Sequence, residues 1–173
     1  MRLSERLAKD FPFMRWKRNE HEDEPYRAVF CGVGEGWYQL IYDMCVEITA
    51  LYAVSELDAN ELFKPKQIKE KYGLLRFYYN TNIHAYELNR EVHKIVVKYV
   101  DISEVTCESC GQPGKLDTSD YWHKVRCDIC KEKDYQRRQQ PVDRAKILRQ
   151  VNSSVYNKIN KDCSSLAAEE ADS

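Results

Sequence analysis

The sequence predicts a small α+β protein, in which two amphipathic helices cover a small antiparallel sheet and a C-terminal zinc ribbon with four cysteine ligands leads into a basic helix. Two long segments repeat apolar residues at the helical period, a β-branched and aromatic segment lies between them, and two Cys-x-x-Cys pairs follow. With 173 residues, 43% of them hydrophobic, the chain has the length of one ordinary domain and can bury a core. We expect a core domain at 1–104, a ribbon at 105–135, a helix at 136–160 and a disordered tail at 161–173.

The first half of the chain contains one short and one long amphipathic helix. Leu3, Leu7 and Phe11 recur at four-residue spacing and predict a short helix that ends near Pro12. A strand-like piece at 28–30 leads into three glycines at alternate positions, which we interpret as a flexible turn. A long helix follows, because its apolar residues form one continuous face: Trp37, Leu40, Ile41, Met44, Cys45, Ile48, Leu51 and Tyr52.

The middle of the chain predicts a small sheet and a second long helix. The segment KQIKEKYGLLRFYYN follows Pro65, and its central Gly73 indicates either two short strands or one strand with a bulge. A helix over 86–104 is predicted by apolar residues at steps of three and four, and it leads directly to Cys107. After the second cysteine pair, Pro141 favours the start of a last helix.

Composition and charge narrow the class of protein. The formal net charge of −1 argues against a protein that holds nucleic acid through Lys and Arg spread over its whole surface. The first residues contain no continuous apolar run, and no later segment reaches the roughly 20 apolar residues of a membrane-spanning helix. We therefore expect no export signal, no membrane span and a cytoplasmic location, where cysteines persist as thiols or metal ligands.

The cysteine spacing predicts a zinc site formed by Cys107, Cys110, Cys127 and Cys130. Each pair has two residues between its cysteines, and 16 residues separate the pairs, which suits two knuckles on one tetrahedral ion. Iron is the main alternative metal, whereas a redox pair would need only one Cys-x-x-Cys. Because the protein fills all four positions, the zinc is expected to be structural. His123 could in principle replace a cysteine as a ligand, but we place it outside the ligand shell.

An HNH-like nuclease is the main enzymatic alternative, because that fold brackets a catalytic His with two Cys-x-x-Cys pairs. Asp120, His123 and Lys131 suggest such a site, but the 16 residues between the pairs contain no Asp-His dipeptide and no Asn. The alternating glycines match no phosphate-binding pattern. We assign no catalytic residue.

Two surfaces are candidates for binding a partner. Nucleic acid binding is suggested by a run of positive residues with nearby aromatics, although Glu132, Asp134 and Asp143 interrupt the run and a solvated helix is the simpler interpretation. The aromatic strand segment suggests a protein interface at Tyr78 and Tyr79, with core packing as its alternative. The positive residues of the run are Lys131, Lys133, Arg137, Arg138, Arg144, Lys146 and Arg149.

Four motifs occur in a fixed order: CGVGEGWYQLI, KQIKEKYGLLRFYYN, CESCGQPGKL and the second pair, CDIC. This ordered set resembles a family of small bacteriophage and prophage proteins that has no established activity, over roughly residues 1 to 130. The resemblance implies a phage or bacterial origin and the cytoplasm of a bacterial or phage-infected cell. Family members often have a His at the fourth metal position, where this chain has Cys130, and the basic extension after Lys131 departs from the family.

Together these observations predict a non-catalytic, zinc-binding phage accessory protein that binds or inhibits a host protein. A zinc-ribbon protein that binds nucleic acid and regulates transcription or replication is the second hypothesis. An HNH-like nuclease is the third. The sequence predicts no oligomeric state.

Overall fold

The computed structural model describes residues 1–17, 26–81, 85–119 and 121–139, and it confirms the α+β fold class. The first half contains α1 Leu3–Asp10, a 3-10 turn Pro12–Met14, β1 Arg15–Lys17, β2 Tyr26–Ala28, β3 Phe30–Gly32, a 3-10 turn Glu35–Trp37 and α2 Tyr38–Val54. The second half contains α3 Ala59–Leu62, β4 Phe63–Lys71, β5 Leu74–Thr81, α4 Tyr86–Ser103, β6 Lys115–Asp117, β7 Lys124–Arg126 and α5 Asp128–Gln139.

The central sheet has three strands in the order β3-β4-β5 and is mixed rather than antiparallel. β4 and β5 form the predicted hairpin, with a register shift between Pro65 and Gln67, so the two-strand interpretation is confirmed and a bulge is present as well. β3 pairs parallel with β4. The antiparallel prediction was wrong for this strand, because β3 returns to the sheet through α2 and α3, and a helical crossover joins parallel strands.

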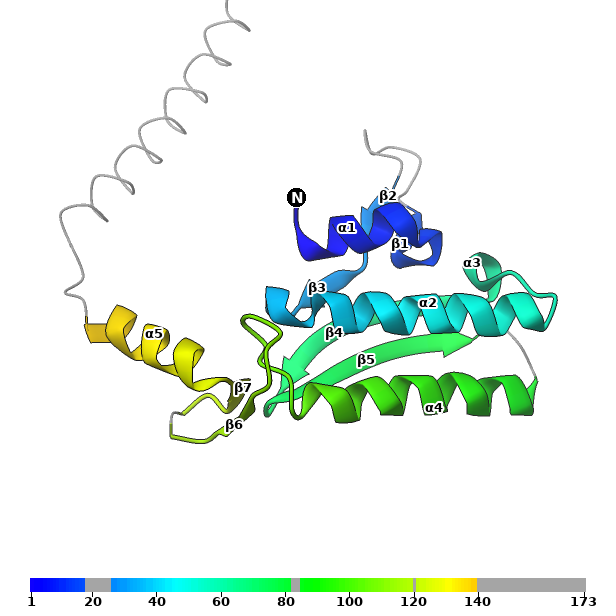
Figure 1. Cartoon of the computed structure of the whole chain (residues 1–173). Helices are drawn as coiled ribbons and strands as arrows, with labels where there is room; N and C mark the ends of the chain where they lie inside the picture. Colours follow the sequence, from blue (N-terminus) through cyan, green and yellow to red (C-terminus); the bar gives the residue numbers. More distant parts are fainter. Residues whose placement is uncertain (18–25, 82–84, 120, 140–173) are drawn as a thin grey trace, which may run out of the picture. The chain divides into compact units, whose positions relative to one another are not determined.

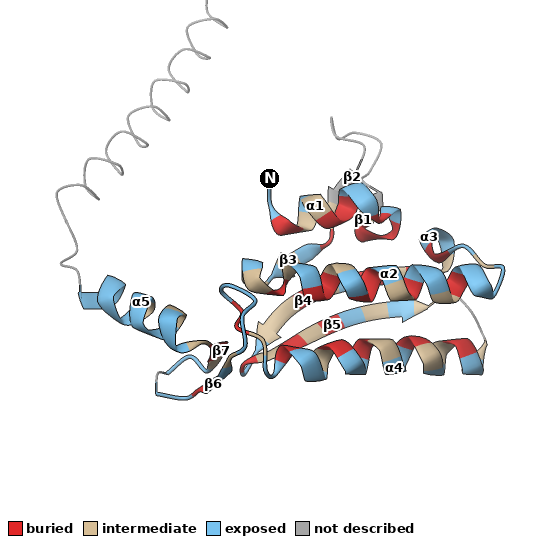
Figure 2. Cartoon of the chain, in the orientation of Figure 1, coloured by how far each residue is buried: buried red, intermediate tan, exposed pale blue. Residues whose placement is uncertain are grey.

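The hydrophobic core lies between the sheet and the two long helices, α2 and α4 (Figure 1). Ile68, Leu75 and Phe77 alternate along β4 and β5 on one face of the sheet, and this face is buried against the helices. The buried residues of α2 and α4 form stripes toward that face, as Figure 2 shows in red. The two predicted amphipathic helices therefore cover the inner face of the sheet.

The N-terminal segment adds a second, two-stranded sheet to this core. α1 buries Leu3 and Leu7 and ends before Pro12, as the spacing predicts. The strand expected at 28–30 is divided, since β2 ends at Ala28 and pairs with β1, whereas β3 begins at Phe30 and pairs with β4. Val29, the residue between these two strands, is fully buried.

The chain divides into two compact units, Met1–Lys133 and Asp134–Ser173. Unit one contains both the helix-covered sheet and the cysteine ribbon, and of unit two the structure describes only the end of α5. α5 begins at Asp128, inside the second cysteine pair, whereas we expected a helix from position 136. The helix predicted after Pro141 and the tail at 161–173 lie outside the described residues. Within the described ranges no helix is long and apolar enough to cross a membrane.

Candidate metal centre

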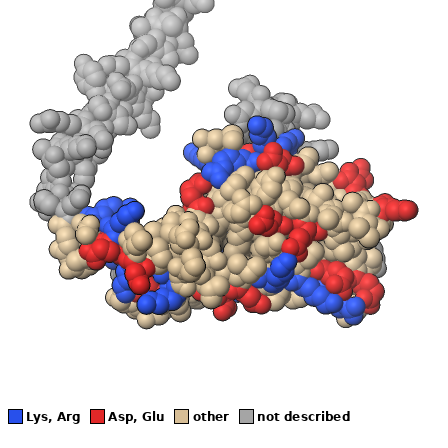
Figure 3. Space-filling model, viewed as in Figure 1, with Lys and Arg blue, Asp and Glu red and all other residues tan. Residues whose placement is uncertain are grey.

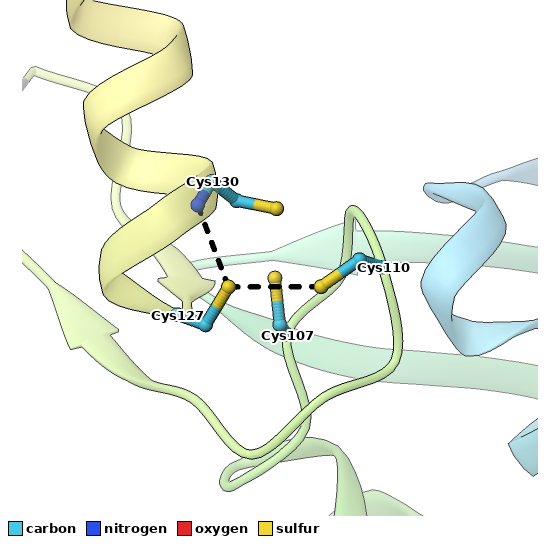
Figure 4. A group of neighbouring side chains, drawn as sticks. All are labelled: Cys107, Cys110, Cys127 and Cys130. Carbon is cyan, nitrogen blue, oxygen red and sulfur yellow. Dashed lines mark hydrogen bonds between the residues drawn. The ribbon is translucent and has the colours of Figure 1, made fainter.

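The four predicted ligand cysteines converge on one point. Their sulfur atoms all lie within 4.8 Å of one another, and Figure 4 shows the side chains directed toward a common centre. Cys107 and Cys110 come from the loop after α4, whereas Cys127 follows β7 and Cys130 lies in the first turn of α5. The centre thus joins the end of the helical core to the beginning of α5. The four thiols could hold a metal ion.

Tight backbone turns position each pair. The N–H of Gly111 donates to the carbonyl of Cys107 at 2.8 Å, and Gly111 has a φ of +77°, a conformation that glycine adopts without strain. In the second pair the N–H of Lys131 donates to the carbonyl of Cys127 at 2.9 Å. The N–H of Cys130 also donates to the sulfur of Cys127, and this bond lowers the pKa of the Cys127 thiol, which favours the thiolate that a metal binds.

The distances are those of separate thiols. The sulfurs of Cys110 and Cys127 are 3.6 Å apart, whereas a disulfide bond measures about 2.05 Å. Cys31 and Cys45 are also free thiols and lie outside the cluster. Burial raises the pKa of the Cys31 thiol to about 12, so this cysteine is an unreactive part of the core edge.

The first cysteine loop is bound to the core through the segment that precedes α2. The backbone N–H of Gly36 donates to the carbonyl of Glu108 at 2.8 Å, and that of Gly34 donates to the Glu108 carboxylate at 2.9 Å. The indole N–H of the fully buried Trp37 donates to the carbonyl of Thr106 at 2.8 Å. These three bonds hold the residues on both sides of Cys107 against the segment that leads into α2.

This contact corrects our interpretation of the three alternating glycines as a flexible turn. A Cβ atom on Gly36 would lie 2.3 Å from the carbonyl oxygen of Cys107, and one on Gly34 would lie 2.3 Å from that of Glu108. Neither distance is sterically possible, so both glycines are required for the close approach of the cysteine loop. The sequence offered one signal, which is the position of these glycines beside a large apolar residue, Trp37.

The predicted β-ribbon between the cysteine pairs is present as β6 and β7, and a buried ion pair crosses it. A guanidinium nitrogen of Arg126 lies 3.2 Å from the carboxylate of Asp117, and both side chains are buried. Burial alone would raise the pKa of Asp117, but hydrogen bonds from Ser119 and Lys131, with the charge of Arg126, hold it well below its usual range. The ribbon is therefore held by charge as well as by thiols.

The remaining predicted site residues lie in several places. Lys131 donates to Asp117 at 2.9 Å and Arg137 is paired with Asp134, while Lys133 and Arg138 lie elsewhere on α5. Arg144, Lys146 and Arg149 lie outside the described residues. Tyr78 is exposed, whereas Tyr79 is half-buried against Phe63 and Phe77. His123 is exposed and is not among the converging groups.

Comparisons with models of protein families, with curated proteins and with solved structures gave no significant match to this chain. The functional argument therefore depends on the geometry of the molecule itself. That geometry identifies a four-thiol centre that can bind a metal ion, formed where the ribbon meets the helical core.

Proposed function

We propose that the protein is a non-catalytic binding module that folds around one structural zinc ion. The observation that carries the proposal is the convergence of four thiols within 4.8 Å. In a tetrahedral site with Zn–S bonds of about 2.3 Å, neighbouring sulfurs are about 3.8 Å apart. The separation of 3.6 Å between Cys110 and Cys127 is close to this value. Four thiolates also suit iron, so metal analysis is part of the test.

A structural role follows from the number of ligands. Four protein thiolates fill a tetrahedral shell and leave no position for an activated water molecule. The ion would instead connect the loop after α4 with the start of α5, two segments that β6 and β7 separate in sequence. Zinc would therefore fix the ribbon, and the activity of the protein would be binding.

A bacterial host protein remains the partner that the phage resemblance suggests. Exposed aromatic side chains support a binding role, since Tyr and Trp provide rigid contact area with a polar tip. Tyr72, Tyr121 and Trp122 are 70%, 98% and 58% exposed, and Tyr78 is exposed as well. Affinity capture from bacterial lysate tests this partner. One stoichiometric host protein that survives nuclease treatment would support it, and retention of nucleic acid alone would contradict it.

Nucleic acid binding through α5 is the second candidate, and its support is weaker than the sequence suggested. The described helix carries four Lys and Arg residues against three Asp and Glu residues, and at least two of the four cations, Lys131 and Arg137, are already paired with carboxylates. Helix surfaces with such mixed charge are usually solvated. A nucleic acid site of this protein therefore needs a stronger cationic surface than the described part of α5.

The zinc proposal is tested by replacing Cys110 with Ser. Cys110 is an exposed ligand, so its replacement leaves no cavity in the core, and any loss of stability must come through the metal. We expect one zinc per chain in the wild type by metal analysis, none in C110S, and a melting temperature lower by about 10 °C, because metal binding is coupled to folding.

Cys31→Ser is the matched control, because this half-buried thiol lies outside the cluster and a hydroxyl can keep its bond to the carbonyl of Val29. We expect C31S to retain its zinc. Unchanged metal content in C110S would contradict the proposal, and iron in the purified wild type would change the identity of the metal.

A further inference from the structure

The outer face of the sheet, opposite the helices, combines exposed aromatic rings with positive charge. Alternation along the strands directs every second residue away from the core. At the register shift in β4, Lys66 is exposed beside Gln67, the residue that pairs with Tyr78. The outer face as used here consists of Phe30 from β3, Lys66, Gln67, Lys69 and Lys71 from β4, and Arg76 and Tyr78 from β5.

The charge of this face is of one sign. Its four ionisable side chains other than tyrosine are Lys66, Lys69, Lys71 and Arg76, and none of them forms an ion pair with a carboxylate in the part of the chain that the structure describes. By contrast, the face of the molecule seen in Figure 3 intersperses Lys and Arg with Asp and Glu. In a chain with a net charge of −1, the outer face is therefore a local basic surface.

One arrangement on this face is unfavourable for folding. Lys69 and Arg76 lie directly opposite each other in the antiparallel pair, and like charges in this position destabilise a sheet. Among the described residues, no carboxylate forms an ion pair with either of them. A polyanionic ligand would remove the repulsion. Ligand binding would therefore explain the Lys69–Arg76 arrangement, which the stability of the sheet does not.

Two aromatic rings lie among these charges. Phe30 is 58% exposed and Tyr78 44% exposed, and both are register partners of Gln67, so they lie on either side of β4. A Cβ on Gly32 would come within 2.9 Å of the ring of Phe30, so the glycine leaves room for that ring over the sheet. The ammonium of Lys69 lies 5.1 Å from the centre of the Tyr78 ring. Exposed rings beside cations are the elements of a stacking surface.

A cleft of about 540 Å³ continues the outer face toward the ribbon. Lys69, Glu70, Lys71 and Tyr72 line it from the β4–β5 hairpin, and Tyr121, Trp122 and His123 line it from the β6–β7 hairpin. The indole N–H of Trp122 donates to the Glu70 carboxylate at 2.8 Å, which fixes the position of an indole that is still largely exposed. The cleft thus adds further aromatic groups next to the same lysines.

We infer that the outer face and this cleft bind single-stranded nucleic acid, with bases stacked on Phe30, Tyr78 and Trp122 and phosphates bound by the lysines and Arg76. Exposed aromatics on a sheet stack unpaired bases, whereas a duplex keeps its bases stacked on each other. An acidic peptide would also use the cations, but unpaired bases match both the cations, through their phosphates, and the exposed rings, through stacking. The inference rests on the proposed non-catalytic binding role, but it assigns nucleic acid rather than a host protein to these exposed aromatic side chains. It uses none of the α5 residues and does not require that the metal be zinc.

The test is fluorescence anisotropy of the full, zinc-loaded chain with labelled oligo-dT and oligo-U of about 16 nucleotides. We expect binding that weakens with salt, with a slope of log K against log salt near −3 for about four phosphate contacts. Phe30→Ala with Tyr78→Ala should weaken binding by about tenfold or more, since each stacked base contributes about 1–3 kcal/mol. Lys69→Ala with Arg76→Ala should reduce the slope by about 1.4.

Matched controls lie on α4. Tyr86 is a 75% exposed ring, so Tyr86→Ala is the control for the aromatic variants and should leave the affinity unchanged. Arg90 and Lys94 are exposed cations, so Arg90→Ala with Lys94→Ala is the control for the charge variants and should leave the salt slope unchanged. Oligo-dT and oligo-U are compared in separate titrations, and the tighter one identifies DNA or RNA as the ligand.

Several results would overturn the inference. These are equal affinity for a duplex, full competition by polyglutamate, or loss of binding in Arg137→Ala with Arg138→Ala but not in the outer-face variants. Absence of any oligonucleotide binding by the zinc-loaded chain would overturn it as well. Metal analysis of the same sample keeps this failure separate from a failure of the structural zinc proposal.

Discussion

The helix-covered sheet and the cysteine ribbon, residues 105–130, are stabilised in different ways. The helix-covered sheet buries large apolar side chains such as Tyr52 and Phe63, which lie in one continuous cluster with the stripes of α2 and α4. In the described part of the ribbon the only buried apolar residues are Cys107 and Val125, and they are accompanied by a buried ion pair. Ribbon side chains such as Tyr121 and Leu116 are instead exposed.

This difference indicates what each region needs in order to fold. Apolar burial contributes about 25 cal/mol for each Å² removed from water, so a continuous core can stabilise itself. A ribbon with two buried apolar residues cannot, and it depends on the Asp117–Arg126 pair, on backbone contacts with the segment before α2 and, in our proposal, on a metal ion held by the four thiols. Chelation should therefore disorder the ribbon and leave the helices of the core formed.

The largest effect in the ribbon apart from metal loss is expected for Asp117→Asn. The replacement removes the buried carboxylate that pairs with Arg126, and breaking a buried ion pair from one side costs about 3 kcal/mol or more. Urea unfolding of the zinc-loaded protein measures this loss. Glu91→Gln, which breaks an exposed pair with Lys94 on α4, is the control and should change stability little.

The same residue predicts a pH dependence. Because the pKa of Asp117 is lower in the folded state than its ordinary value of about 3.9, its stabilising contribution is complete above that pH and is lost as the pH falls below it. The Asn variant should lose this acid-dependent term. If wild type and variant show parallel stability curves between about pH 5 and pH 2, the ribbon does not depend on this charge.

A smaller effect is expected where the two regions meet. Gly36→Ala would place a methyl group 2.3–2.5 Å from three backbone atoms of the cysteine loop, so the loop must move away from α2, at a cost of about 2 kcal/mol. Gly32→Ala is a matched change in the same segment, but its obstacle is the ring of Phe30, a side chain that can rotate. We expect G36A to lower the melting temperature and weaken zinc binding, and G32A to do neither. Equal effects would mean that the loop is not held at Gly36.

The parts of the fold that sequence could predict are those determined by neighbours along the chain. The stripes of α2 and α4 repeat over many turns, and each cysteine pair is a local turn, so periodicity and spacing were sufficient. The ribbon expected at 105–135 is present as β6 and β7, each of only three residues. The chemistry of the site was therefore predictable before its surroundings were.

The parts that could not be predicted depend on distant partners. Gly34 and Glu108 are separated by 74 positions, and apart from the neighbouring Trp37 nothing local distinguishes these glycines from those of a flexible turn. β3 has only three residues, too few for an alternation that would reveal its parallel pairing with β4. The outer face combines three strands, so its single charge sign became visible only with the register known.

The smallest effect in this comparison is expected at the end of α4, next to the ribbon. The hydroxyl of the buried Ser103 accepts a bond from the backbone N–H of Leu75 at 3.1 Å and donates to the carbonyl of Val100, so it ties β5 to the last turn of the helix. Ser103→Ala leaves a buried N–H without that partner and should cost about 1–2 kcal/mol by urea unfolding. Ser55→Ala removes a bond of the same kind to the carbonyl of Leu51 at an exposed site, where water replaces it, and should change stability little. Because Ser103 belongs to the core, S103A should keep its zinc, and loss of zinc in this variant would show that the two regions fold as one unit.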